Sequence, residues 1–274
     1  MIKKPGKTTC AALLLALLAA SGSASAGDEA SASAWIAGAN SQARLLAAGP
    51  PVDGIYLAGI EVALKGQAHT YWRQPGDAGV PPTVSFLGSR NVKQAALRYP
   101  APMRLDEGGL QVFGYRNGVL LPLEVEPEDP AAPVHLAVSF SYAACEKICI
   151  PAEASAALDL TPEAAPAPEA ERLAQARAAL PQRHANGEKI ELSARAEVGT
   201  DKPLWHLRIA RPEGPWRDIF AEGPEGWFIE TRATPEGFDL IAAERPSDAH
   251  LPVPVTLTLA GVRDYEVRID LAGP

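Results

Sequence analysis

Two cysteines lie close together near the middle of the chain, in the stretch SYAACEKICIPAE at residues 141–153. Three residues separate Cys145 from Cys149, and Pro151 follows two positions later. Two thiols at this spacing suit a structural disulfide, a metal site, or a redox pair that exchanges with other disulfides. The residues around the two cysteines indicate which of these three kinds of chemistry is favoured.

The segment that ends at Cys145 has the alternating pattern of a half-buried strand. Apolar side chains recur at every second position, namely at Leu136, Val138, Phe140 and Tyr142. A second apolar segment begins at Ile148, so the three residues between the cysteines fit the loop of a tight hairpin. Residues that flank such a loop have Cβ atoms about 4.5–5.5 Å apart. A disulfide needs roughly 3.5–4.5 Å, so a small relaxation closes the bond.

A purely structural bond at this spacing would stabilise the fold only weakly. In the chain-entropy model, closing a loop of about five residues contributes on the order of 2 kcal/mol, against nearly 5 for a loop of about 100 residues. Short bridges at hairpin ends are also easily strained and exposed, which are properties of labile disulfides. The spacing leaves both the reactive and the structural interpretation open.

Metal and hydrolase chemistry have less support in the sequence. Structural zinc takes four ligands, whereas the five histidines are scattered without paired spacing: His69, His135, His184, His206 and His250. We interpret each as a surface or core residue and predict no metal and no other cofactor. A copper site made of two thiolates remains an alternative. The chain has no G-x-S-x-G, no H-E-x-x-H and no phosphate-binding glycine loop.

The first 26 residues have the pattern of a secretory signal peptide. Lys3, Lys4 and Lys7 precede an apolar run at 11–20, and an A-x-A cleavage site ends at residue 26. Removing these three lysines changes the formal net charge from −8 to −11. Such a charge disfavours nucleic acid or an anionic membrane as partner. We therefore expect a soluble periplasmic protein without membrane insertion after cleavage, in a compartment where a cysteine pair can oxidise.

The remaining sequence is predicted to be all-β, with two small β-sandwiches. Short alternating segments bounded by Gly and Pro fill residues 27–160 and again 190–274. Residues 161–189 between them are rich in Pro, Ala and charge, and 168–180 predicts a short surface helix. The predicted organisation is a signal peptide at 1–26, one β domain at 27–160, a helical linker at 161–189 and a second β domain at 190–274.

A further unusual stretch is TYWRQPGDAGVPP at residues 70–82. Its prolines and glycines predict a long turn. The turn does not explain why Tyr71, Trp72 and Arg73 are grouped at its start. The aromatic residues either plug the end of a sandwich or shield a nearby site.

Four motifs in order resemble the N-terminal periplasmic domain of the DsbD family of thiol–disulfide interchange proteins, in particular its ScsB-like branch. They are TYWRQPGDAGVPP, NVKQAALRYPAPMR, GYRNGVLLPLEV and YAACEKICIPAE, and the resemblance covers roughly residues 40–160. The resemblance implies an immunoglobulin-like fold for this domain. The second β region resembles the extra β domain of that branch more loosely, so we expect two immunoglobulin-like β-sandwich domains.

The resemblance also implies roles for particular residues. Cys145 and Cys149 correspond to the family's redox pair, with Cys149 attacking the partner and Cys145 resolving the mixed disulfide. Asp106 and Glu107 correspond to acidic residues beside the cap loop that closes over the cysteines. Tyr71 and Trp72 fall near aromatic residues that line the site. The implied activity is that of a component of a protein-disulfide reductase.

The implied partners are periplasmic thioredoxin-fold proteins and a membrane thiol-electron transporter of the CcdA or DsbD type. The family's membrane and thioredoxin-like domains have no counterpart in this sequence, so we expect the transporter to act in trans. Cytochrome c maturation and copper tolerance are the implied processes. The alternatives are a non-enzymatic adaptor with a structural disulfide and a copper-handling protein.

The sequence departs from the family pattern at the cap and in the cysteine spacing, which is wider in the family's well-known member. Gly108 and Gly109 replace an aromatic residue of the cap, and Leu110 or Phe113 are the candidates to shield the site instead. Lys147 favours a thiolate and Glu146 opposes it, and a hairpin has no helix dipole. We therefore expect a weak free nucleophile whose selectivity comes from docking to a partner that displaces the cap.

Overall fold

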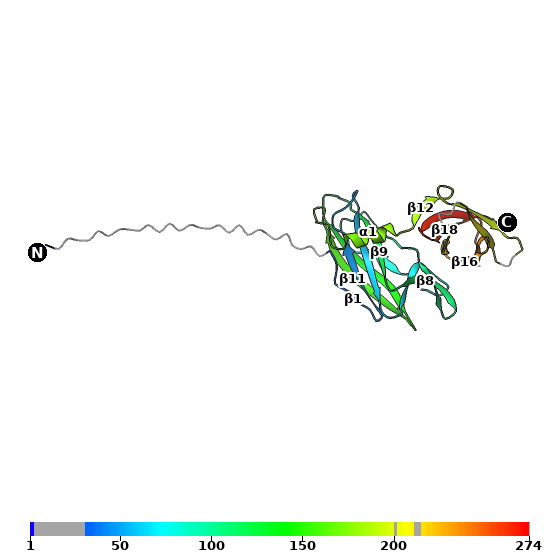
Figure 1. Cartoon of the computed structure of the whole chain (residues 1–274), viewed down its shortest axis with the longest axis horizontal. Helices are drawn as coiled ribbons and strands as arrows, with labels where there is room; N and C mark the ends of the chain where they lie inside the picture. The colour runs from blue at the N-terminus through cyan, green and yellow to red at the C-terminus, as the bar shows by residue number, and fades with distance from the viewer. Residues whose placement is uncertain (3–30, 200–201, 211–214, 274) are drawn as a thin grey trace.

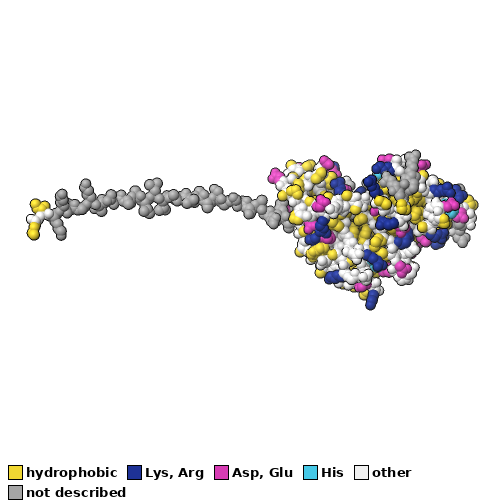
Figure 2. All heavy atoms as spheres, in the orientation of Figure 1, with side chains coloured by type: hydrophobic (Ala, Val, Ile, Leu, Met, Phe, Trp, Pro, Cys, Tyr) yellow, Lys and Arg dark blue, Asp and Glu magenta, His cyan; other side chains and the backbone are white. Residues whose placement is uncertain are grey.

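A computed structural model describes residues 1–2, 31–199, 202–210 and 215–273. The described chain is mostly β, as predicted, and its strands form four sheets in two groups that lie side by side (Figure 1). The predicted signal peptide falls almost wholly outside the described residues. Among the described residues, no helix is long and apolar enough to cross a membrane. On the face in Figure 2, basic side chains are interspersed with acidic ones.

The first group comprises two sheets that share one hydrophobic core. One sheet has the order β1-β2-β3-β9-β6, with strands Ile36–Ala37, Ser41–Ala47, Tyr56–Leu64, Val119–Glu126 and Gln94–Leu97. The other has the order β11-β10-β4-β8-β7, with strands Cys149–Leu160, Val134–Cys145, His69–Gly76, Leu110–Arg116 and Met103–Glu107. The short strand β5 (Thr83–Ser85) pairs with β10. The second of these sheets carries the cysteines.

The predicted cysteine hairpin is confirmed. Strands β10 and β11 are antiparallel over 12 residues each, and their last register pair is Cys145 with Cys149. The apolar alternation before Cys145 also corresponds to burial, because Leu136, Val138 and Phe140 all lie in the core. Burial of one face of β10 fixes the register, since a slip by one residue would turn these side chains to the opposite face.

The second group also comprises two sheets around one core. One has the order β12-β19-β18-β15, with strands Gln182–Ala185, Tyr265–Leu271, Val253–Ala260 and Asp218–Glu222. The other has the order β13-β14-β17-β16, with strands Glu191–Ala196, Leu204–Ala210, Gly237–Glu244 and Phe228–Thr234. Between the groups lies helix α1 (Ala170–Ala178), within the predicted 168–180. The range expected as linker also contains β12, which pairs in parallel with β19.

Helix α1 lies on the first group of sheets and is mostly exposed. Its one buried side chain is Leu173, which fits against Gly59 of β3, where a Cβ atom would lie 2.5 Å from a Leu173 methyl group. Glycine at position 59 therefore permits the close approach of the helix to the strand. The apolar face of the helix thus contributes a single large buried side chain, which agrees with the alanine-rich face that the sequence predicts.

The two groups of sheets make an apolar contact through Phe220 of β15. Its ring lies 5.8 Å from that of Trp72 and 5.0 Å from that of Phe113, measured between centroids, and both contacts are edge-on. Phe220 is fully buried and belongs to the core of the first group. Such aromatic pairs add roughly 0.5–1.5 kcal/mol each beyond the burial of their area.

Two arginines flank this apolar contact and form ion pairs across it. Arg73 of β4 donates to Glu222 over 2.8 and 2.6 Å and also contacts Glu266. Arg104 of β7 donates to both carboxylate oxygens of Asp218, over 2.9 and 2.8 Å. Bidentate pairs of this kind fix orientation as well as distance. Strands β4 and β7 of the first group are therefore each joined to the second group by a bidentate ion pair.

We expect the ion pairs at this contact to lose strength in acid. Burial acts to raise the pKa of Glu266, but Arg73 and Arg183 outweigh it and hold that pKa below its usual 4.5. A carboxylate with a lowered folded-state pKa adds stability above its unfolded pKa, and that stability is lost as the pH falls through the folded value. Glu266→Gln should lower the unfolding free energy by about 1 kcal/mol at neutral pH, because Arg73 is partly exposed and keeps Glu222.

The measurement is urea unfolding of wild type and variant across a pH series. The difference in unfolding free energy between wild type and variant should shrink as the pH falls below 4.5, the usual pKa of Glu266. The exposed Glu225 provides the matched control, and Glu225→Gln should follow wild type at every pH. A difference in unfolding free energy that stays constant down to strong acid would contradict a stabilising role for the ionised Glu266.

Candidate functional site

The disulfide lies at the loop end of the β10–β11 hairpin. It joins Cys145 and Cys149, whose Cα atoms lie 4.0 Å apart. Cys145 also pairs with His69 of β4, so β10 is flanked on both sides and Cys145 is only 1% exposed. Cys149 begins the edge strand β11 and is exposed. The two sulfur atoms of one bond are therefore unequally accessible to another molecule.

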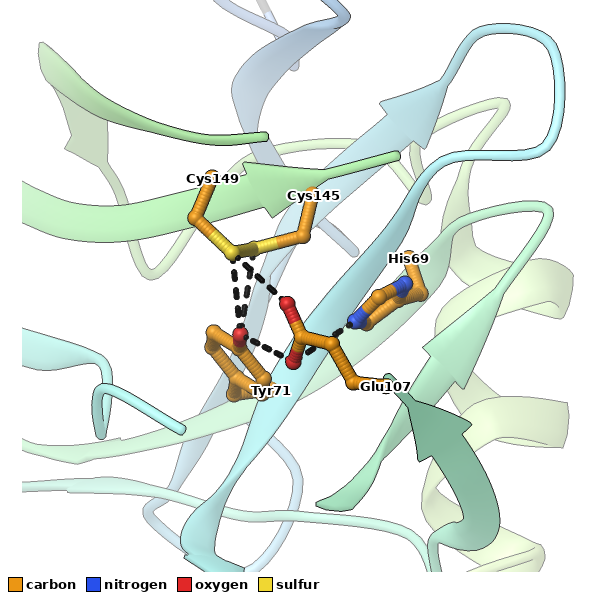
Figure 3. The surroundings of a disulfide bond; sticks show 5 residues. All are labelled: His69, Tyr71, Glu107, Cys145 and Cys149. Carbon is orange, nitrogen blue, oxygen red and sulfur yellow. Dashed lines mark hydrogen bonds and ion pairs between the residues drawn. A yellow bond between two sulfur atoms is a disulfide. The ribbon is translucent and has the colours of Figure 1, made fainter. Parts of the chain in front are cut away.

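Two side chains from other strands point at the sulfur atoms (Figure 3). The Tyr71 hydroxyl oxygen lies 3.1 Å from Cys149 Sγ and 3.2 Å from Cys145 Sγ. Glu107 Oε1 lies 3.0 Å from Cys149 Sγ, and the Tyr71 hydroxyl donates a hydrogen bond of 2.8 Å to Glu107 Oε2. A disulfide sulfur has no hydrogen to donate, so the short approach of Glu107 suits a reduced Cys149, whose thiol can donate to the carboxylate.

The turn between β7 and β8 explains how Glu107 reaches the sulfur atoms. Gly108 and Gly109 form a two-residue loop with φ of 66° and 91°. A hairpin loop with positive φ at both positions requires residues such as glycine. Glu107 is the last residue of β7 and pairs with Leu110, so the tight turn leaves its side chain free to extend toward Cys149. The glycine pair thus permits the tight turn that brings Glu107 beside the sulfur atoms.

The predicted supporting residues separate into two sets. Tyr71 and Glu107 contact the sulfur atoms. Trp72 is fully buried in the core, because neighbouring side chains on a strand point to opposite faces. Asp106 is exposed, and its carboxylate accepts a hydrogen bond of 3.4 Å from the Gly109 backbone. Within the aromatic group, Tyr71 therefore contacts the sulfur atoms, whereas Trp72 packs in the core.

The two candidates for replacing the missing aromatic residue of the cap also lie apart from each other. Phe113 is 2% exposed and packs against Phe220, away from solvent. Leu110 is 48% exposed beside the glycine turn. Ile148, in the loop between the cysteines, is 69% exposed. The side chains that flank Glu107 and Cys149 in the chain therefore present apolar surface to solvent.

His69 lies beside the site, although no sequence motif singles it out. It precedes Tyr71 by two positions on β4, so both side chains point to the same face, and their rings meet edge-on at 5.5 Å. His69 Nε2 lies 3.7 Å from Glu107 Oε2. Burial lowers the pKa of His69 and Arg116 lowers it further, against the opposing effect of Glu107. Strand alternation from Tyr71 is the signal that could have identified it.

The surroundings of Tyr71 favour its protonated form. Burial, and after it Glu107, raise the pKa of Tyr71. Tyr71 therefore keeps its proton at physiological pH and acts as a hydrogen-bonding group, not as a base. In the reduced protein a Cys145 thiol can donate to the Tyr71 oxygen while the Tyr71 hydroxyl donates to Glu107. These two hydrogen bonds form a path by which the proton of the buried Cys145 thiol can reach the carboxylate of Glu107, which is partly exposed.

Comparison with known proteins found a family model and a solved structure to which this chain is similar. Residues 44–161 match the family model described as thiol:disulfide interchange protein DsbD, N-terminal. The crystal structure of the N-terminal periplasmic domain of ScsB from Proteus mirabilis has the same fold, with a TM-score of 0.66 and 20% sequence identity. The similarity covers 89% of this chain and 99% of that one. A search of curated proteins found no match.

We expect Glu107 to restrain the nucleophilicity of Cys149 in the reduced protein. A carboxylate 3.0 Å from the sulfur opposes formation of the negative thiolate. Glu107→Gln removes this charge and should raise the rate of alkylation of Cys149 by iodoacetamide at neutral pH by about 3–10-fold. The rate is measured by mass spectrometry of quenched samples.

The adjacent acid supplies the matched control. Asp106→Asn removes the same charge one residue away, where the side chain faces the glycine turn. It should change the alkylation rate much less. Equal acceleration by both variants would mean that the general negative field controls Cys149, and not its contact with Glu107.

Proposed function

Residues 44–161 form a DsbD N-terminal-like thiol–disulfide exchange domain, and from this premise we propose that the protein carries electrons through Cys145 and Cys149. It accepts them from a membrane thiol-electron transporter and passes them to periplasmic oxidoreductases of the thioredoxin fold. The unequal exposure of the two sulfur atoms is the observation that carries this proposal, because exchange needs one sulfur that a partner can reach and a second that can resolve the product.

Reduction of a partner proceeds in two exchanges. The Cys149 thiolate attacks a sulfur of the partner disulfide, forming an intermolecular bond, and the second partner sulfur leaves as a thiolate that takes up a proton. Cys145, after losing its proton along the path through Tyr71 to Glu107, then attacks Cys149 Sγ. The Cys145–Cys149 bond forms and the partner leaves as a dithiol. Two electrons have passed to the partner, and the domain is oxidised.

Reduction of the domain by the transporter runs through the same exchange steps in reverse, again at the exposed sulfur of Cys149. A thiolate of the membrane transporter attacks Cys149 Sγ, and Cys145 leaves as a thiolate. The hydroxyl of Tyr71 lies 3.2 Å from Cys145 Sγ and can supply the first hydrogen bond to this buried anion, with the proton following from Glu107 or solvent. A second thiol of the transporter attacks its own mixed disulfide, so the transporter is oxidised and the domain becomes a dithiol.

We also propose the finer organisation of the chain. Two sheets around one core in each group of strands fit two immunoglobulin-like domains, at 27–160 and 190–274, with α1 in the segment 161–189 between them. The signal peptide at 1–26 and the periplasmic location belong to the same proposal. Roles in cytochrome c maturation and copper tolerance stay predictions.

Trapping the mixed disulfide tests the carrier function. Cys145→Ser removes the resolving thiol while Cys149 can still attack, so the variant should accumulate a disulfide between Cys149 and a thioredoxin-fold protein in periplasm. Cys149→Ser is the matched control and should trap at least about tenfold less, since its remaining thiol is buried. Non-reducing electrophoresis and mass spectrometry identify the partner and the linked cysteine.

A structural disulfide predicts a different result from the same two variants. Both substitutions would then lower the melting temperature by a similar amount, and neither would trap a partner. Trapping through Cys145 in the Cys149→Ser variant, and not through Cys149, would reverse the proposed roles of the two cysteines.

Partner docking should depend on the apolar surface beside the exposed sulfur. Ile148 is 69% exposed and precedes Cys149 in the chain, so a docking protein that reaches the sulfur must cover it. Ile148→Glu should slow exchange with the trapped partner by roughly tenfold, since losing an important interface side chain costs more than about 1 kcal/mol. Reaction with oxidised glutathione should change far less, because a small disulfide needs no docking surface.

Stopped-flow fluorescence measures both rates. Val262→Glu is the control, since Val262 is 83% exposed in the second group of sheets, and it should leave both rates unchanged. Equal slowing of the protein and the small disulfide by Ile148→Glu would show a change in Cys149 itself and would refute the docking role.

A further inference from the structure

One polar atom of the site is not explained by thiol–disulfide exchange. His69 is 6% exposed, and its Nε2 atom makes no hydrogen bond among the described residues, because its contact with Glu107 Oε2 is 3.7 Å long. A buried nitrogen without a partner costs free energy and calls for an explanation. A neutral imidazole nitrogen is a common ligand of metal ions in proteins.

The surroundings of this nitrogen consist of metal-binding groups. His69 Nε2, a carboxylate oxygen of Glu107 and Cys145 Sγ all lie within 4.8 Å of one another. Cys149 Sγ lies 3.0 Å from the other oxygen of Glu107. Figure 3 shows all four side chains directed toward one another from separate strands. In the disulfide, the sulfur atoms are bonded to each other, so reduction is the event that would release two thiolates as ligands.

We propose that the reduced protein binds one Zn²⁺ ion through Cys145, Cys149, His69 and Glu107. Two thiolates, one imidazole and one carboxylate supply the four ligands of a tetrahedral zinc site. Zn²⁺ displaces the thiol protons, which pass to solvent, and no electron moves. The inference requires only that the disulfide can be reduced, and it goes beyond the proposed electron transfer.

The geometry of the sheet suits this ion. With zinc–ligand distances of about 2.0–2.3 Å, ligand atoms in a tetrahedron lie roughly 3.3–3.8 Å apart. The ligand atoms, which lie within 4.8 Å of one another, therefore need to approach by about 1 Å. Opening of the disulfide lets the sulfur atoms separate toward the same spacing. Three anionic ligands leave one negative charge around Zn²⁺, and Arg116, paired with His69 in the β4–β8 ladder, offsets it.

A bound ion would have a direct consequence for reactivity. Both thiolates would be held by the metal, so Cys149 could not attack a disulfide until a partner or a chelator removed the ion. The same ligation would protect the thiols from oxidation, because a coordinated thiolate is less available to oxidants. At the proposed site, a bound Zn²⁺ ion would keep the protein reduced and prevent its reaction with disulfides.

Zinc and cobalt titrations of the whole chain test the proposal. The reduced protein should take up one Zn²⁺ per chain in competition with a chromogenic chelator and release protons, and the oxidised protein should take up none. Co²⁺ should give the intense visible bands of tetrahedral coordination and thiolate charge-transfer bands. Failure of the reduced wild type to bind Zn²⁺ would overturn the proposal.

Substitution of the histidine separates this site from simple chelation by two thiols. His69→Gln should weaken Zn²⁺ binding by about tenfold or more, at least the effect of losing an outer-shell partner, and should change the Co²⁺ spectrum. His135→Gln is the matched control, since His135 lies near the opposite end of β10 and pairs with Asp159. Unchanged affinity in His69→Gln would overturn the role of the histidine.

A second variant keeps the test decisive if His69→Gln fails to fold. Glu107 is less buried than His69, and Glu107→Gln should also weaken Zn²⁺ binding and alter the Co²⁺ bands. Exchange with the trapped partner in the presence of a chelator is measured in parallel. Exchange without zinc binding refutes only the metal site, whereas zinc binding without exchange refutes only the electron carrier.

Discussion

The register of one antiparallel hairpin determines the chemistry of this protein. Burial of one face of β10 fixes its pairing with β11, and that pairing ends with Cys145 opposite Cys149. Because β10 lies inside the sheet and β11 at its edge, the same register buries one sulfur and exposes the other. The division of labour between an attacking and a resolving cysteine is therefore a property of sheet topology. It requires no special residue at either cysteine.

The second group of sheets supports the site through the strands that build it. Tyr71 and Arg73 lie on β4, and Arg104 and Glu107 lie on β7. On each strand, one residue contacts the sulfur atoms while another is ion-paired with the second group. Phe220 fills the apolar space between these two ion-paired edges. The positions of Tyr71 and Glu107 therefore depend on a contact that the first group cannot make alone.

The sequence was informative wherever the structure follows local periodicity. The all-β class and the cysteine hairpin followed from alternation before Cys145 and from the short loop after it. Glu107 and Tyr71 came from the family resemblance, since nothing local brings residues 71 and 107 to a cysteine at 149. His69 was missed for the same reason: its neighbours are set by the strand order β10-β4-β8-β7, which one sequence does not encode locally. The family resemblance placed Trp72 with the site together with Tyr71, although strand alternation directs the Trp72 side chain into the core.

The surroundings of the sulfur atoms favour a carrier that stays unreactive until it is docked. Glu107 opposes a thiolate at Cys149, and burial isolates Cys145 from solvent. Tyr71 contacts both sulfur atoms and stays protonated, so it can donate a hydrogen bond to a sulfur anion once the thiol proton has passed on to Glu107. Glu107 lies at the end of a hairpin that is held at Arg104, three residues away, and is free at its glycine turn. A partner that moves only this turn would withdraw the opposing charge and leave Tyr71 in place, which raises the reactivity of Cys149 at the moment of contact.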